Sequence, residues 1–303
     1  MTDLAFGFSL VPTLDIGFHR EIAVAAEESG LRLLGIQDHP YVPDYLDTLV
    51  LAGQVLAVTS RISVFPDVVN LPLRPPVMLA KSAAALDIVS GGRFELAVGA
   101  GGYWDAITRM GVPRRSREEA NTALEEAIAI LRAVWGSGPA IRQRGVFYAV
   151  DGARPGPAPA HPIGIWTGAQ GPKALALTGR LADGWAAPIA SYLPYEKWPE
   201  ANAILDQAAT AAGRRPRDIR RIAQLVGEIT DRPGDSHTEH GSAPVRGTAD
   251  QWATLLARLA LEQPYTAFVF WPEQQTVDQV VRFGHDVAPL VRETLNSGRA
   301  DAS

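Results

Sequence analysis

The chain contains no cysteine among its 303 residues. Disulfide bonds, thiolate nucleophiles and cysteine-ligated metal sites are therefore excluded, and thiol usage says nothing about the redox compartment. An excess of basic residues is also missing, because 28 Lys and Arg against 33 Asp and Glu leave a formal charge of −5. Nucleic-acid binding draws its affinity from surplus cations, so we do not expect a polyanionic partner.

Long apolar runs are absent as well. None approaches the roughly 20 residues that a membrane-spanning helix needs. The first segment, MTDLAFGFSLVPTLD, carries Asp3 where a signal peptide would carry basic residues. We therefore expect a cytoplasmic protein without a membrane partner. With 47% hydrophobic residues the chain can bury one large core. Since no linker marks a boundary, we expect a single domain over residues 1–303.

Strand-like and helix-like segments alternate along the whole chain. Short apolar, β-branched or aromatic runs predict strands at Leu4–Val11, Leu31–Gln37, Arg61–Val68, Arg93–Val98, Ile163–Thr167, Gly184–Ile189, Ile219–Ile229 and Thr266–Trp271. Helical periodicity and capping signals predict helices at His19–Ser29, Leu46–Thr59, Pro75–Val89, Ser116–Trp135, Pro172–Ala182, Tyr195–Ala212, Thr248–Glu262 and Val277–Leu295. A hairpin at Arg142–Val150 and a polar loop at Thr230–Gly247 interrupt the alternation.

Eight strand-then-helix units predict an α/β fold, a parallel (β/α)₈ barrel of the TIM type. A doubly wound open sheet is the alternative. No G-x-G-x-x-G pattern opens the first strand-to-helix turn, which weighs against that alternative.

Functional residues of such a barrel follow the carboxyl ends of its strands. Asp38 and His39 follow the second predicted strand, and a histidine beside a carboxylate can give or take a proton near neutral pH. The alternative is a histidine that only anchors a loop. Asp67 and Asn70 follow the third strand in the proline-rich run Pro66–Pro76, which either holds the backbone in a strained shape against a ligand or is a plain connection.

Two glycine-rich segments follow the fourth and fifth strands. Glycines in the run Gly99–Asp105 allow a backbone to approach a flat or anionic ligand closely. Gly168–Gly171 leads into a helix with Pro172 near its first position, where free N–H groups can bind phosphate, and Lys173 adds a cation. A simple helix cap is the alternative there. Together the four segments predict a planar, phosphate-bearing cofactor rather than a metal.

Several aromatic residues lie near these segments. Trp104, Trp166, Trp185 and Trp271 could line a substrate pocket, or could be part of the core, because tryptophan is largely buried on average.

Three stretches resemble a known family. They are DHPY (38–41), LPLRPPVMLAKSAAALDIVSGGRFELAVGAG (71–101) and TGAQGPKALALTGRLADGW (167–185). They are similar to the bacterial-luciferase-like oxidoreductases, which use a flavin or the deazaflavin coenzyme F420. The resemblance covers nearly the whole chain except the polar loop 230–247. It implies a barrel with insertions, a homodimer, and a cofactor across the carboxyl ends of the strands.

The resemblance also implies site residues. His39 matches the catalytic position facing the isoalloxazine ring. Asp67 and Val68 match a bulge that contains a non-proline cis peptide, and Asn70 matches a side chain at the pyrimidine edge. The implied cofactor-binding set is Asp38, His39, Asp67, Val68, Asn70, Gly99, Ala100, Gly101, Gly168, Ala169, Gln170 and Gly171.

The implied activity is that of an FMN- or F420-dependent oxidoreductase or monooxygenase acting on a small organic molecule. Either the reduced cofactor delivers a hydride, or reduced FMN first forms a flavin hydroperoxide with oxygen, and His39 moves the proton. Sugar-phosphate dehydrogenases of the F420 branch have a catalytic glutamate where this chain has Gly102, and their phosphate-binding cations are replaced by Pro188 and Ser191. That activity is therefore not expected.

Two other classes of function remain as alternatives. A metal-dependent barrel hydrolase would need histidines and carboxylates that converge on a cation. No His-x-His pattern occurs at a strand end, and His237 and His240 lie in the polar loop. The second alternative is a flavin-binding protein without turnover.

Overall fold

The computed structural model describes residues 4–234 and 241–300. In this part of the chain, parallel strands form one sheet in the order β3-β2-β1-β12-β10-β9-β8-β5-β4. Their bounds are β1 (Ala5–Leu10), β2 (Leu33–Ile36), β3 (Ser63–Pro66), β4 (Val69–Asn70), β5 (Leu96–Gly99), β8 (Ile165–Thr167), β9 (Gly184–Ala186), β10 (Arg220–Ile229) and β12 (Ala267–Pro272), and a short strand β11 (Val245–Gly247) pairs with β10.

The two ends of this sheet meet. Val64 of β3 forms a parallel bridge with Phe94, just before β5. The N–H of Val64 donates to the carbonyl of Arg93 at 2.9 Å, and the N–H of Glu95 donates to the carbonyl of Val64 at 3.0 Å. Because β4 continues β3 after an irregular step at residues 67 and 68, the sheet closes into the barrel that the eight repeating units predict. The open-sheet alternative is therefore wrong.

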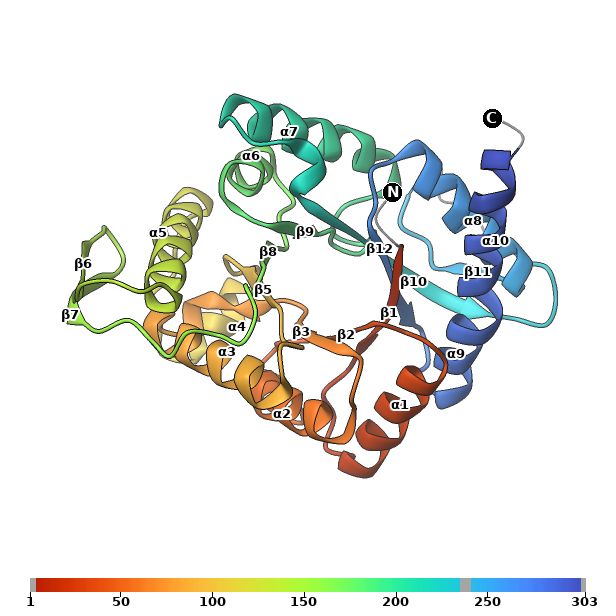
Figure 1. The fold of residues 1–303 in the computed structure, drawn as a ribbon, viewed down its shortest axis with the longest axis horizontal. Coiled ribbons are helices and arrows are strands. Elements are labelled where there is room, and N and C mark those ends of the chain that lie inside the picture. Colours follow the sequence, from red (N-terminus) through yellow and green to blue (C-terminus); the bar gives the residue numbers. More distant parts are fainter. Residues whose placement is uncertain (1–3, 235–240, 301–303) are drawn as a thin grey trace.

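Helices surround the ring of strands (Figure 1). Their bounds are α1 (Ile16–Glu28), α2 (Thr48–Val58), α3 (Pro76–Ser90), α4 (Trp104–Arg109), α5 (Arg117–Trp135), α6 (Pro172–Leu181), α7 (Trp198–Ala211), α8 (Ala249–Glu262), α9 (Val277–Arg282) and α10 (Ala288–Ala300), with a π-helical turn at Phe283–Val287. The predicted helices correspond to all of these except the short α4, which the sequence did not indicate. No helix in the described residues is long and apolar enough to cross a membrane.

Helix ends follow local chemistry. Ser116 and Glu119 form a reciprocal capping box at the start of α5, and Thr248 and Gln251 form another at α8. Gly91 ends α3 in the left-handed conformation, with φ 70°, that favours glycine. The predicted hairpin is present as β6 (Ile141–Arg144) and β7 (Ala149–Ala153), which project beside α5 (Figure 1).

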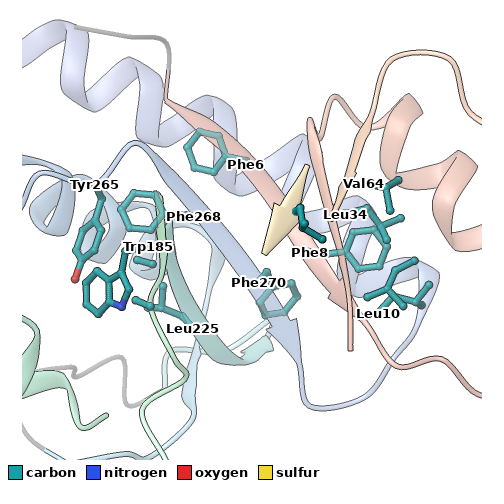
Figure 2. Packing of buried hydrophobic residues seen from close by; sticks show 14 of the residues in the cluster. Phe6, Phe8, Leu10, Leu34, Val64, Trp185, Leu225, Tyr265, Phe268 and Phe270 are labelled. Atoms are coloured by element: carbon teal, nitrogen blue, oxygen red, sulfur yellow. The ribbon is translucent and has the colours of Figure 1, made fainter. Parts of the chain in front are cut away.

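The strands bury one face against the helices and the other inside the barrel. Outward-facing aromatic side chains on neighbouring strands lie side by side, as Phe6 and Phe8 of β1 do beside Phe268 and Phe270 of β12 (Figure 2). Inward-facing side chains form a separate apolar layer of Leu33, Phe65, Ala97, Trp166, Ile222, Ala267 and Val269. This layer fills the barrel, so a ligand can be held only beyond it, toward the strand ends.

Candidate functional site

The carboxyl ends of β2, β3, β5 and β8 bring the four predicted segments to one mouth of the barrel. Because β2 pairs with β3 and β5 pairs with both β4 and β8, residues that follow these strands are spatial neighbours. A peptide bond in the cis form joins Asp67 and Val68, at the position that the family resemblance implies. The ligand-binding roles of these residues stay predictions.

Asp38 is held in place by Arg74. The two side chains pair through Arg74 Nη2 to Asp38 Oδ1 at 2.8 Å and Nε to Oδ2 at 3.1 Å, and Asp38 is 1% exposed. Oδ2 also accepts the backbone N–H of Asn70 at 2.8 Å. Burial lowers the pKa of Arg74, but the bonds and charges of Asp38 and Asp47 outweigh it and raise the pKa overall. Asp38 therefore anchors the strand-3 loop next to the histidine.

His39 is surrounded by tyrosine rings. Its Nδ1 is 2.7 Å from the hydroxyl of Tyr41, and its ring centroid is 5.5, 6.5 and 6.0 Å from those of Tyr41, Tyr45 and Tyr103. Tyr103, from the loop after β5, hydrogen-bonds through its hydroxyl to Tyr192, which follows β9. Burial lowers the pKa of His39, and the charge of Asp38 offsets part of that effect. The lowered pKa favours the neutral form of the imidazole at pH 7.

Asp67 points into the barrel. Its Oδ1 accepts a bond of 3.0 Å from Gln224 on β10, whose Oε1 in turn accepts the indole N–H of Trp271 on β12. Its Oδ2 is buried without a hydrogen-bond partner in the described structure, 2.9 Å from where a Cβ on Gly35 would lie. Burial raises the pKa of Asp67 to about 7, and its contacts with Gln224 and Ser9 offset only part of that rise. The bulge therefore contributes a titratable carboxyl group that points into the barrel.

Val68 packs against the two glycine-rich segments. A Cβ on Gly99 would lie 2.8 Å from Val68 Cγ2, and one on Gly168 would lie 3.2 Å from the same atom. By contrast, a Cβ on Gly102 or Gly171 would meet nothing within 4 Å. Gly99 and Gly168 are thus needed to fit the bulge itself, a reason the sequence did not show.

Two polar features of the mouth have no protein partner. The side-chain oxygen Oδ1 of Asn70 is buried and unpartnered within the described residues. Helix α6 begins after Gly171 with Pro172 in its first turn and no side-chain cap. Lys173, predicted as a cation for this end, pairs with Glu118 at 3.3 Å, and both are largely exposed. An acceptor and a helix N-terminus are therefore available to a ligand.

The tryptophans divide between two roles. Trp166 and Trp185 are buried and belong to the core. Trp271 reaches the mouth through its bond to Gln224, and Trp104 lies at the start of α4 beside Gly101. The roles of Arg74 and Gln224 were not predicted from the sequence, because they depend on contacts between segments far apart in the chain. The tyrosines around His39 were not predicted either, although Tyr41 is only two residues from the histidine and its position in DHPY was the available signal. His237 and His240 lie outside the described residues.

The chain is similar in sequence to known enzymes of two kinds. An F420-dependent glucose-6-phosphate dehydrogenase from Nakamurella multipartita is 32% identical over 174 residues, 54% of this chain and 50% of that protein. A pyrimidine monooxygenase from Escherichia coli is 30% identical over 216 residues, 69% of this chain and 57% of that one. This chain thus spans only about half to two thirds of the length of such relatives.

A solved structure extends the comparison to the fold. Riboflavin lyase with modified FMN and riboflavin superposes with a TM-score of 0.81 at 16% identity, over 96% of this chain and 92% of that one. A family model described as luciferase-like monooxygenase matches residues 5–262. The chain belongs to the luciferase-like monooxygenase family.

Proposed function

We propose that this protein is an oxidoreductase that holds FMN or coenzyme F420 at the carboxyl-end mouth of its barrel and acts there on a small organic molecule. The observation that carries the proposal is the buried, unpartnered Oδ1 of Asn70 beside the bulge at Asp67 and Val68. A buried acceptor without a partner costs free energy, so its persistence suggests that a ligand donor completes it.

The residues present fit such a cofactor. Asn70 can accept a hydrogen bond from an N–H at the pyrimidine edge of either ring. The uncapped N-terminus of α6 after Gly171 offers backbone N–H groups to a phosphate. Val68, held between Gly99 and Gly168, supplies an apolar surface against which a flat ring can rest. When bound, the cofactor supplies the two-electron chemistry, and the protein supplies position and proton control.

His39 is the proposed catalytic residue, a donor to the reacting molecule. It follows β2 at the mouth, is partly buried, and its Nδ1 bonds to the hydroxyl of Tyr41. A single well-placed donor of this kind contributes about 10²- to 10³-fold to turnover. We expect His39→Ala to reduce kcat by about that factor while the protein stays folded.

The substrate differs from that of the sugar-phosphate dehydrogenases. Gly102 stands where those enzymes carry a glutamate. Because glycine has no side chain, this position supplies no carboxylate to a sugar. We propose instead the reduction or oxygenation of a small organic molecule.

Turnover of the reduced cofactor tests the proposal. Purified protein is supplied with reduced F420, or with FMN and an NADH-driven flavin reductase, and cofactor oxidation is followed with panels of small carbonyl, alkene and heteroaromatic compounds. His285→Ala is a matched control, because His285 is exposed on the outer helical turn. Binding without turnover for every compound would favour the flavin-binding protein, and a loss equal in both variants would remove His39 from its role.

We also propose that the protein forms a homodimer through α2 and α3. These neighbouring helices carry exposed apolar side chains, with Val50 75% exposed on α2 and Met78 58% and Val89 77% on α3. Light scattering of the wild type should give twice the mass of one chain. The double variant Val50→Lys, Met78→Lys should give the mass of a single chain. A monomeric wild type would contradict this.

A further inference from the structure

The hydrogen bond between Tyr41 and His39 has a direction that decides what His39 can do. A neutral imidazole carries one N–H donor and one acceptor nitrogen, and the bonding partner of one nitrogen selects which of them holds the proton. A phenol can donate or accept, so the contact at Nδ1 permits two arrangements. In one, Nε2 carries a proton and can only donate. In the other, Nε2 carries a lone pair and can act as a base.

The contact distance favours the phenol as donor. The separation of 2.7 Å between Nδ1 and the hydroxyl matches the usual length of O–H donors, about 2.7–2.8 Å, better than that of N–H donors, about 2.9–3.0 Å. An imidazole lone pair is localised in the ring plane, whereas a phenol oxygen shares its electrons with its ring. The nitrogen is therefore the stronger acceptor of the two atoms.

The surroundings keep both groups neutral. Burial is the main cause that raises the pKa of Tyr41, and Tyr103, Tyr192 and Asp38 add to it. Burial also lowers the pKa of His39, against the opposing charge of Asp38. A protonated phenol faces a neutral imidazole, and the ring of Tyr103 packs edge-on against His39 from the β5 side.

We propose that Tyr41 is a positioning residue that donates to Nδ1 of His39 and so keeps the imidazole in the tautomer with its proton on Nε2. The inference rests on the proposed function, because it specifies how His39 meets the reacting molecule. In this tautomer Nε2–H stabilises negative charge that develops on an acceptor atom. Nε2 cannot abstract a proton, so the site serves reduction or oxygenation of an acceptor rather than base-initiated chemistry.

The cost of a tyrosinate limits Tyr41 to this role. If Nε2 gave its proton to the reacting molecule, Nδ1 would have to take the proton of the Tyr41 phenol for the imidazole to stay neutral. Tyr41 would then be left as a tyrosinate. The raised pKa of Tyr41 makes that transfer unfavourable. The neutral pair therefore acts by hydrogen bonding, and Tyr41 influences the reaction through His39 only.

Nitrogen-15 NMR of the cofactor-free protein, labelled at histidine, tests the proposal directly. The signals of His39 are identified by their loss in His39→Gln. We expect the wild type at pH 8 to show Nε2 protonated and Nδ1 unprotonated, and Tyr41→Phe to show a mixture of both tautomers. Tyr45→Phe is the matched control, because Tyr45 contacts the same imidazole by its ring. We expect it to leave the tautomer unchanged.

Kinetics supply a second readout. Loss of one orienting hydrogen bond should lower kcat in Tyr41→Phe by about three- to tenfold with KM little changed. Tyr148→Phe, which changes a tyrosine in the β6–β7 hairpin whose hydroxyl bonds to Arg115, should keep the wild-type kcat. A wild-type signal with Nδ1 protonated, or an unchanged tautomer in Tyr41→Phe, would overturn the proposal. The NMR measurement needs no cofactor, so failure of FMN and F420 to bind would sink the proposed function while leaving this result readable.

Discussion

Arg74→Met should destabilise the protein strongly, because it leaves the Asp38 carboxylate buried without its cation. The side chain of Asp38 is 1% exposed and would keep only the backbone N–H of Asn70 among its present partners. Breaking a buried pair by removing one partner costs about 3–5 kcal/mol. The loss should also weaken cofactor binding, since the same carboxylate holds the backbone of Asn70.

Chemical denaturation measured with a matched set of variants separates this effect from general loss of packing. Asp38→Asn combined with Arg74→Met removes the stranded charge and should recover most of the lost free energy of unfolding. Asp47 is the other partner of Arg74, and its side chain is 41% exposed. Asp47→Asn removes that charge but keeps a side chain able to cap α2. It should cost less than about 1 kcal/mol. A cost below about 1 kcal/mol for Arg74→Met itself would show that Asp38 does not depend on Arg74 for its charge balance.

Two further predictions concern the bulge. Gly99→Ala should cost about 1–3 kcal/mol of stability, because its methyl group would collide with Val68. Adding Val68→Ala to that variant should restore much of the loss, and Gly102→Ala alone should be close to neutral. Additive effects in the double variant, measured by denaturation, would contradict the contact. Asp67→Asn should change the pH dependence of stability. Since burial raises the folded pKa of Asp67 from 3.8 to about 7, the wild type loses stability as the pH rises from about 4 through 7. The variant should lack that loss, and parallel stability curves would be the opposing result.

Much of the fold follows from local pattern. Each predicted strand overlaps an observed one, because the apolar runs that feed β1, β2 and β10 are short, buried and bounded by turn residues. Alternation of strand and helix then leaves few topologies besides the closed parallel barrel. Placement of His39 and Asn70 at the mouth follows from the same rule.

The internal contacts of the site could not be predicted in this way. Arg74 reaches Asp38 across 36 positions, and Gln224 reaches Asp67 across 157. Such pairs depend on barrel closure and strand register, and neither can be predicted from a local sequence pattern. Gly99 and Gly168 were predicted as places where the backbone approaches a ligand. Their packing against Val68 was not predicted, because it depends on β5 and β8 lying next to the bulge.

Equilibrium binding of FMN and of F420 to the purified protein, followed by quenching of cofactor fluorescence, tests whether this mouth of the barrel holds a cofactor. We expect saturable binding of one of the two at one site per chain. We also expect about tenfold weaker binding by Asn70→Leu, which removes the buried acceptor, and unchanged binding by His285→Ala. Failure of both cofactors to bind the folded wild type, or equal affinity in Asn70→Leu, would contradict a cofactor site at this mouth of the barrel.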